Sequence, residues 1–146
     1  MNIAFFLTPK SEVIYEKHTA TMRQALERME YHSYTAIPLI DSKGHYVGTL
    51  TEGDLLWKVK NSEDFSFRNV EKILVKDIPL STKIEPVKIN SDIEGLIDLA
   101  KSQNFVPVVD DNQIFIGIIT RSDIINYCFN MIYNSSELNT LVVNQN

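Results

Sequence analysis

The chain has 146 residues, of which 44% are apolar, and it carries a formal net charge of −5. These values are typical of a soluble globular domain with one core. The acidic balance argues against a nucleic-acid-binding protein, which normally has a basic surface. No run of about 18 apolar residues is present in the sequence, so no membrane-spanning helix is expected.

The beginning of the chain does not have the pattern of a secretory leader. Its apolar stretch, residues 3–7, lacks a basic leader and a small-residue cleavage site, so no signal peptide is expected. The single cysteine, Cys128, has no partner in the chain for a disulfide bond. We therefore expect a cytoplasmic protein.

The first predicted elements are a short strand and a helix. Residues 13–20 predict the strand. Thr21 and Gln24 have the spacing of a capping box, in which two side chains satisfy the unpaired amides at the start of a helix. Apolar residues then recur at helical spacing, namely Met22, Leu26 and Met29.

A hairpin and a second helix follow in the first half. The apolar segments 36–41 and 46–50 flank a polar turn, which is typical of two paired strands. Thr51 then opens the next helix. The predicted order in this half is strand, helix, strand, strand, helix.

The second half repeats this order. Residues 84–89 predict a strand, and Ser91 with Glu94 predicts a capping box at the start of a helix. A hairpin over residues 106–119 and a helix opened by Thr120 complete the half. The interval from proline to glycine is ten residues in both halves, from Pro38 to Gly48 and from Pro107 to Gly117.

An internal repeat of this kind predicts an α+β fold made of two similar units. We place their boundary between residues 69 and 70, so that residues 1–69 and 70–146 each hold one repeat. A 60-residue unit buries only about 60% of its surface, whereas a 150-residue chain buries about 70%. The two units are therefore expected to pack face to face and to share a core.

Each half contains the pattern Gly-x-x-Thr-x-x-Asp, with Thr51 and Asp54 in the first copy and Thr120 and Asp123 in the second. One interpretation is purely structural, because threonine and a carboxylate three residues later can cap a helix. The other is a nucleotide site. Helix amides and a threonine hydroxyl suit phosphate, and the aspartate can accept hydrogen bonds from the cis-diol of a ribose.

The segments "YTAIPLID…YVGTLTEGDLL" and "NFVPVVDD…FIGIITRSDII" resemble the two halves of a CBS-domain pair, or Bateman module. The resemblance covers about residues 13–127. It implies tandem βαββα repeats about a pseudo-twofold axis, a disc-shaped homodimer, and two clefts between the repeats. It also implies binding of an adenosine-containing ligand, such as AMP, ADP, ATP, S-adenosylmethionine or a diadenosine compound. Small stand-alone CBS proteins of Gram-positive bacteria are similar, and some of them bind cyclic di-AMP.

The resemblance also implies which residues form the two clefts. The first cleft would consist of Tyr34, Thr35, Ala36, Ile118, Thr120, Arg121 and Asp123. The second, which we expect to be less fully occupied, would consist of Thr51, Asp54, Asn104, Phe105 and Val106. Arg121 lies in the first turn of its helix, where it faces either a ligand anion or a surface carboxylate. The equivalent residue of the first repeat, Glu52, would repel phosphate.

No pattern in the sequence indicates catalysis. His18, His32 and His45 are scattered and have no other ligand at metal-binding spacing. Cys128 lies in an apolar run and is expected to be packed rather than nucleophilic. We therefore expect no catalytic residue, no metal and no catalytic cofactor.

These observations predict a non-catalytic sensor that signals to an unidentified effector protein. A ligand-free interaction scaffold is the alternative, and a nucleotide hydrolase is less favoured. The helix over residues 124–133 is apolar almost all round, so it should be buried on more than one side. Its second cover would be a twin subunit in a homodimer or the chain's own tail.

Overall fold

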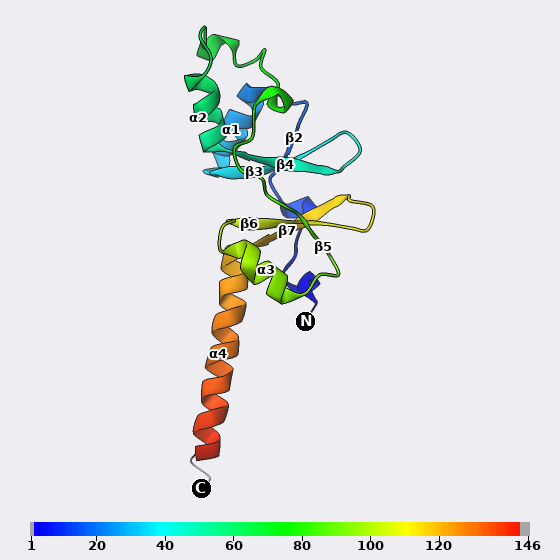
Figure 1. Ribbon diagram of the computed structural model, residues 1–146, viewed down its shortest axis with the longest axis vertical. Helices are drawn as coiled ribbons and strands as arrows, with labels where there is room; N and C mark the ends of the chain where they lie inside the picture. The colour runs from blue at the N-terminus through cyan, green and yellow to red at the C-terminus, as the bar shows by residue number, and fades with distance from the viewer. Residues whose placement is uncertain (1, 144–146) are drawn as a thin grey trace.

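The computed structural model describes residues 2–143, without the side chains of residues 138, 139, 141 and 142. Two small sheets lie next to each other along the long axis, each with two helices (Figure 1). Helix α4 extends far from the body, so that the C-terminal end of the described chain lies at one tip of the molecule.

The first repeat forms a three-stranded sheet of order β2-β3-β4 with two helices. Strand β2 is parallel to β3, and β3 is antiparallel to β4. The elements are β2 (Glu16–Lys17), α1 (Met22–His32), β3 (Ala36–Ile40), β4 (Tyr46–Thr51) and α2 (Glu52–Lys60). The predicted strand over residues 13–20 is therefore much shorter than expected.

The second repeat has the same element order in a four-stranded sheet, β1-β7-β6-β5. Its own elements are β5 (Val87–Lys88), α3 (Ile93–Ala100), β6 (Phe105–Val109), β7 (Phe115–Thr120) and α4 (Arg121–Val143). The hairpins also share their register, because Ala36 lies opposite Thr51 and Phe105 lies opposite Thr120. The predicted α+β fold with tandem βαββα repeats is confirmed.

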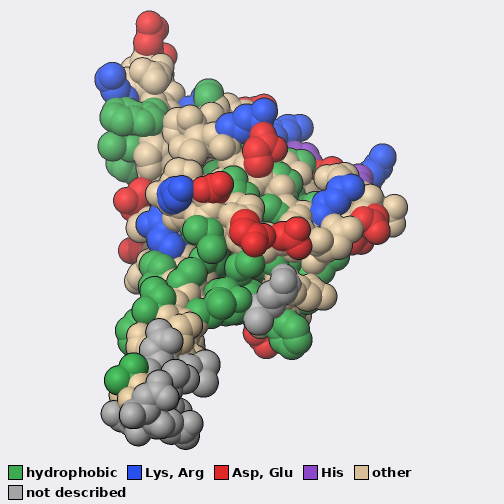
Figure 2. All heavy atoms as spheres, turned by 60° about the horizontal axis from the view of Figure 1, so that its bottom comes forward, with side chains coloured by type: hydrophobic (Ala, Val, Ile, Leu, Met, Phe, Trp, Pro, Cys, Tyr) green, Lys and Arg blue, Asp and Glu red, His purple; other side chains and the backbone are tan. Residues whose placement is uncertain are grey.

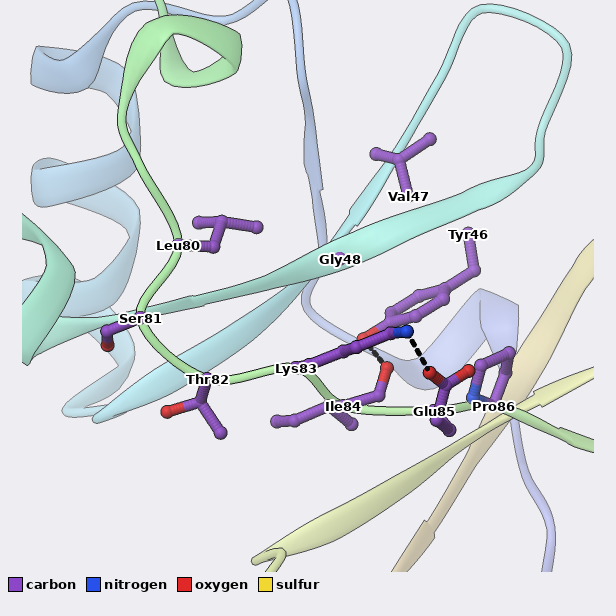
Figure 3. A pocket seen from close by; sticks show the side chains of 10 residues that line it. All are labelled: Tyr46, Val47, Gly48, Leu80, Ser81, Thr82, Lys83, Ile84, Glu85 and Pro86. Carbon is purple, nitrogen blue, oxygen red and sulfur yellow. Dashed lines mark hydrogen bonds and ion pairs between the residues drawn. The ribbon is translucent and has the colours of Figure 1, made fainter.

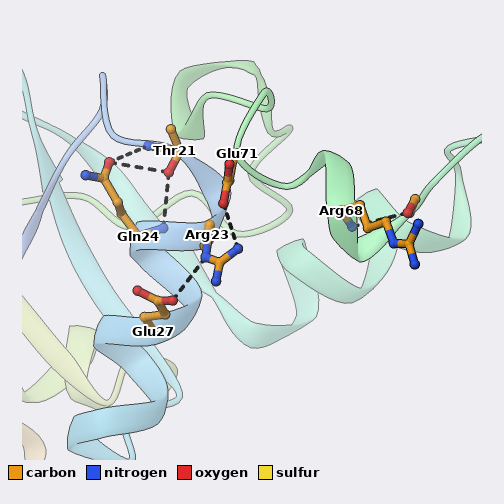
Figure 4. Close-up of polar contacts among 7 residues, drawn as sticks. Thr21, Arg23, Gln24, Glu27, Arg68 and Glu71 are labelled. Atoms are coloured by element: carbon orange, nitrogen blue, oxygen red, sulfur yellow. Dashed lines mark hydrogen bonds and ion pairs between the residues drawn. The ribbon is translucent and has the colours of Figure 1, made fainter.

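A capping box was predicted at the first helix of each repeat, and the two predictions have different outcomes. At α1 the prediction is confirmed: Gln24 N donates to Thr21 Oγ1 at 3.2 Å, and Thr21 N donates to Gln24 Oε1 at 2.9 Å (Figure 4). At α3 it is wrong, since Asp92 is the N-cap residue and makes no capping bond with its side chain. Ser91 N donates to the carbonyl of Lys88 and so belongs to the preceding turn.

Each repeat is completed by a segment from outside its own elements. The N-terminal segment forms 3₁₀ helices at Ile3–Phe6 and Lys10–Glu12, and between them β1 (Thr8–Pro9) pairs with β7 of the second repeat. The linker forms 3₁₀ helices at Phe67–Asn69 and Val75–Asp77 and packs onto the first repeat. The sequence pattern did not predict that the N-terminal segment would pair with the second repeat or that the linker would pack onto the first.

The linker is tied to helix α1 by both apolar and polar contacts. Val75 and Ile78 are buried in the core of the first repeat, and Met22 N donates to the carbonyl of Ile73 at 2.7 Å. Arg23 also contacts the linker, with 2.7 Å between its Nη1 and Glu71 Oε1 (Figure 4). Exposed ion pairs contribute little to stability, so the buried apolar residues hold this segment in place.

The two repeats share a small core between their sheets, as predicted. Phe115 of β7 is fully buried there against Val13 and Ile40, and the rings of Tyr15 and Tyr46 lie 6.2 and 6.4 Å from its ring. Phe115 N also donates to the carbonyl of Gly44 at 2.9 Å and so joins the two hairpins. Larger cores lie within each repeat.

Helix α4 keeps an apolar surface that the described residues do not cover. Ile125, Phe129 and Ile132 are exposed by 58%, 65% and 68%. Residues 137–143 do not fold back over them but continue the helix away from the body (Figure 1). Figure 2 shows hydrophobic side chains gathered where α4 leaves the body.

Within residues 2–143, no helix combines the length and apolar character needed to cross a membrane.

Candidate functional site

A cavity of about 250 Å³ lies between the two sheets and is walled by both repeats and by the N-terminal segment. Three lining residues lie in β3 or just before it, and four lie in the hairpin of β6 and β7 or just before it. Its lining residues are Thr8, Glu12, Val13, Ile14, Tyr34, Ala36, Pro38, Asn104, Phe105, Ile118 and Thr120. Most of this wall is apolar, with a few polar groups, as is usual for a small-molecule site.

The cavity brings together four of the residues expected in the first cleft: Tyr34, Ala36, Ile118 and Thr120. Thr35 lies beside it but is exposed, and its carbonyl accepts a hydrogen bond from Glu52 N at 2.9 Å. Asn104 and Phe105 were expected in the second cleft, yet they line this same cavity.

Four lining residues from the N-terminal segment, Thr8, Glu12, Val13 and Ile14, were not among the predicted site residues. They reach the cavity because β1 runs along β7 beside Gly117. A side chain at Gly117 would overlap the carbonyl oxygen of Thr8, so this close approach requires glycine. The glycine of the repeated motif was therefore the only sequence signal for a crossing segment here.

Thr120, which lines the cavity, forms a pair with Asp123 at the start of helix α4, and Asp123 itself is not among the lining residues. Thr120 Oγ1 donates to Asp123 Oδ2 at 2.7 Å, and Asp123 N donates to Thr120 Oγ1 at 3.1 Å. Both residues are partly exposed. Among the described residues, no further donor contacts the Asp123 carboxylate, so this group keeps acceptor capacity that a ligand hydroxyl could use.

Arg121 lies outside the cavity and holds the end of helix α3. Its Nε donates to the carbonyls of Ala100 at 2.8 Å and Gln103 at 3.1 Å. A cation is favourable there because carbonyl groups and the negative end of the helix dipole meet at a helix C-terminus. The sequence led us to expect a ligand anion or a surface carboxylate as the partner of Arg121. The Nε atom instead contacts two backbone carbonyls.

Thr51 and Asp54 form the corresponding pair in the first repeat, but Asp54 is almost fully buried, with 1% of its surface exposed. Its Oδ1 accepts hydrogen bonds from Ser81 N at 2.7 Å and Ser81 Oγ at 2.6 Å. Its Oδ2 accepts another from Thr51 N at 2.9 Å. Burial raises the pKa of Asp54, but the bonds from Ser81 and Thr51 outweigh it and hold this pKa below its usual value.

A second hollow, of about 520 Å³, lies where the linker crosses strand β4 (Figure 3). Tyr46 is its most firmly held side chain: its hydroxyl donates to the carbonyl of Ile84 at 3.2 Å and lies 2.7 Å from Thr49 Oγ1. Burial raises the pKa of Tyr46 to about 12. The residues expected in the second cleft do not line this hollow, which consists of Tyr46, Val47, Gly48 and residues 80–86.

The remaining candidate residues pack against, or form hydrogen bonds with, other parts of the protein and do not line the cavity. Val106 is buried in the core of the second repeat, and Cys128 packs against the same core. His18 and His45 contact the carbonyl of Ile40 and the carboxylate of Asp41, and the His32 ring stacks on Tyr34. Among the described residues, no three His, Cys, Asp or Glu side chains are grouped so that they could hold a metal ion.

Curated relatives cover most of the chain at low identity. A Methanopyrus kandleri protein, MK0525, is 29% identical over 119 residues, which are 80% of this chain and 58% of that protein, so the chain spans little more than half of its length. Cyclic di-AMP receptor B of Bacillus subtilis is 27% identical over 116 residues, which are 80% of this chain and 78% of the receptor.

Two solved structures show the same fold. CbpB in complex with c-di-AMP has a TM-score of 0.83 at 20% identity, and the alignment covers 94% of this chain and 90% of that one. CBSX2 in complex with AMP has a TM-score of 0.70 at 23% identity, covering 89% and 97%. The CBS domain family matches twice, over residues 6–61 and 75–130, which are the two repeats of the fold described above. The chain therefore belongs to the CBS domain family.

Proposed function

We propose that the chain is a non-catalytic regulatory sensor, which binds an adenosine-containing ligand in the cavity between its repeats and signals to a partner protein. One observation carries this proposal: Thr120, which is hydrogen-bonded to Asp123 at the start of α4, lines the same cavity as Tyr34 and Ala36 of the first repeat. The two repeats together thus supply groups that neither supplies alone.

The lining suits a nucleoside. Ile14, Phe105 and Ile118 offer apolar surface to the faces of a purine ring. The Asp123 carboxylate, held beside the cavity by Thr120, can accept hydrogen bonds from both hydroxyls of a ribose. Candidate ligands are AMP, ADP, ATP and cyclic di-AMP, in keeping with a relative named as a cyclic di-AMP receptor and a related structure solved with AMP.

Isothermal titration calorimetry with adenosine, AMP, ADP, ATP and cyclic di-AMP tests this proposal. Saturable heat with at least one of these compounds, and its loss in the Asp123→Ala variant, is the expected result. Absence of binding by every compound, with thermal unfolding also unchanged by them, would favour a ligand-free interaction scaffold. Formation of a cleavage product from ATP with magnesium would contradict a non-catalytic role.

We further propose that a second copy of the chain covers the apolar surface of α4 in a homodimer. Ile125, Phe129 and Ile132 follow one another at helical spacing and are more than half exposed. Light scattering should give about twice the 16.7 kDa mass of the chain. A monomer mass at all accessible concentrations would contradict the dimer.

A further inference from the structure

We propose that the cavity selects adenosine derivatives whose 5′ group is neutral or positively charged, and that Glu12 is the residue that disfavours a 5′ phosphate. This inference rests on the proposed function and, among adenosine-containing ligands, ranks those without a 5′ phosphate above AMP, ADP, ATP and cyclic di-AMP. It follows from the hydrogen bonds around the start of α4 and from the charges on the cavity wall.

Three of the groups that could hold a phosphate at the start of α4, two amides and one hydroxyl, already have partners within the protein. Arg121 N donates to the carbonyl of Asn104 at 2.9 Å, and Asp123 N donates to Thr120 Oγ1 at 3.1 Å. The Thr120 hydroxyl gives its only proton to Asp123 Oδ2 at 2.7 Å. A helix start binds an anion through free amides and hydroxyl donors, and these three donors are not free.

Arg121, the cationic residue at the start of α4, also points away from the cavity. Arg121 Nε contacts the carbonyls of Ala100 and Gln103, and the side chain borders a groove between α3 and α4 rather than the cavity. Among the described residues, no lysine, arginine or histidine lines the cavity. A phosphate bound there would have only neutral donors as partners, such as Asn104 and the hydroxyl of Thr8.

The charge that does line the cavity is negative. Glu12, in the 3₁₀ helix Lys10–Glu12, is exposed, and within the described part of the chain its carboxylate makes no ion pair. Asp123 adds a second carboxylate beside Thr120. Two acceptors with no facing cation repel a phosphate dianion and attract hydrogen-bond donors or an ammonium or sulfonium group.

The size of the cavity agrees with a single nucleoside. Its volume of about 250 Å³ lies below the range of about 300–1,000 Å³ that is common for sites of drug-sized ligands. A purine nucleoside with a short 5′ substituent is therefore a better match than a ligand that carries two nucleotides.

Three probes that differ only at the 5′ position test this inference by calorimetry: adenosine, 5′-amino-5′-deoxyadenosine and AMP. We expect the amine to bind most tightly and AMP least, with steps of about two- to fivefold, as for a solvent-exposed charge pair. The Glu12→Gln variant should reduce the preference for the amine over AMP. Glu30→Gln is the matched control, because it changes net charge equally at an exposed residue outside the cavity.

Two outcomes overturn the inference while the proposed function stands: AMP binds most tightly, or Glu12→Gln and Glu30→Gln alter the three affinities alike. If none of the three probes binds, and no other adenosine compound does, the proposed function itself fails and the selectivity fails with it.

Discussion

Asp54 and Asp123 occupy the same position in their repeats, three residues after the threonine that precedes a helix, but their surroundings differ. Asp54 is fully enclosed and accepts hydrogen bonds from Ser81 and Thr51. Asp123 is partly exposed and is contacted by the Thr120 hydroxyl alone among the described donors. The same pair of residue types thus secures the fold in one repeat and borders a cavity in the other.

The difference arises from the segments that cross the two sheets. The linker passes β4 (Figure 3), and the amide and hydroxyl of Ser81 donate hydrogen bonds to the Asp54 carboxylate. The N-terminal segment passes β7 through Thr8 and leaves Asp123 uncovered, while Glu12 to Ile14 add a wall to the cavity. A duplicated motif therefore acquires its role from a segment outside the repeat.

The largest expected effect is on stability at the enclosed aspartate. Asp54→Ala leaves the Ser81 and Thr51 amides without their acceptor in a buried place, which should lower the free energy of unfolding by about 2–3 kcal/mol. Urea unfolding measures this loss. Asp123→Ala is the matched control and should cost about 1 kcal/mol or less, as for a lost helix cap. Equal losses in the two variants would contradict the comparison.

The second expected effect is on ligand affinity, and here Asp123 rather than Asp54 is the sensitive position. Asp123→Ala removes the acceptor for the ribose hydroxyls, and a hydrogen bond to a charged group is worth about 1.5–3 kcal/mol, or about 10- to 150-fold in affinity. Calorimetry with the tightest-binding adenosine compound measures this change. Ser81→Ala, which acts only on the Asp54 side, should leave the affinity within about twofold. An unchanged affinity in Asp123→Ala would remove this carboxylate from the site.

A third effect is on the pH dependence of stability, and its sign follows from the lowered pKa of Asp54. The pKa of Asp54 is lower in the folded protein than in the unfolded chain, where an aspartate titrates at about 3.9. Its contribution to stability is thus complete above that value and is lost as the pH falls through the lower, folded pKa. The stability difference between the wild type and Asp54→Asn should therefore shrink from about pH 6 to about pH 3.

The exposed residue Asp64, which makes no ion pair among the described residues, supplies the control for this titration. The Asp64→Asn variant should follow the wild type at every pH. A difference between the wild type and Asp54→Asn that stays constant or grows on acidification would contradict the lowered pKa of Asp54.

The sequence was sufficient for features that depend on near neighbours. The element order, the hairpin registers and the caps at Thr21 and Thr51 follow from spacing along one segment, and the structure has all of them. The cap expected at Ser91 failed because Ser91 and Asp92 can both start the helix, and the turn after β5 uses Ser91. Which of two adjacent residues becomes the N-cap is thus decided by the turn after the preceding strand rather than by the capping residues themselves.

The candidate site was predictable only in part, because much of it depends on distant segments. Tyr34, Ala36, Ile118 and Thr120 belong to the repeated motifs and could be placed from them. Glu12 belongs to no motif, and nothing near it in the chain indicates that it lines the same cavity as Thr120. In the same way, no local pattern shows that Ser81 contacts Asp54, which lies 27 positions earlier in the chain.

The smallest expected effect concerns Arg121, whose cation the helix dipole of α4 alone would disfavour. Its Nε bonds to the carbonyls of Ala100 and Gln103 place the charge at the C-terminus of α3 instead. Arg121→Met should therefore cost about 1 kcal/mol of stability or less. It should also shift the affinities for adenosine and AMP by the same factor. The two ligands differ only in the phosphate, and the Arg121 side chain lies outside the cavity. Lys101→Met is the control: it removes a charge at the same helix end but only the exposed contact with Asp98, and it should cost less than Arg121→Met. A selective loss of AMP binding in Arg121→Met would mean that the side chain turns to the phosphate when ligand is present. In that case the carbonyl contacts would hold Arg121 only in the unliganded protein.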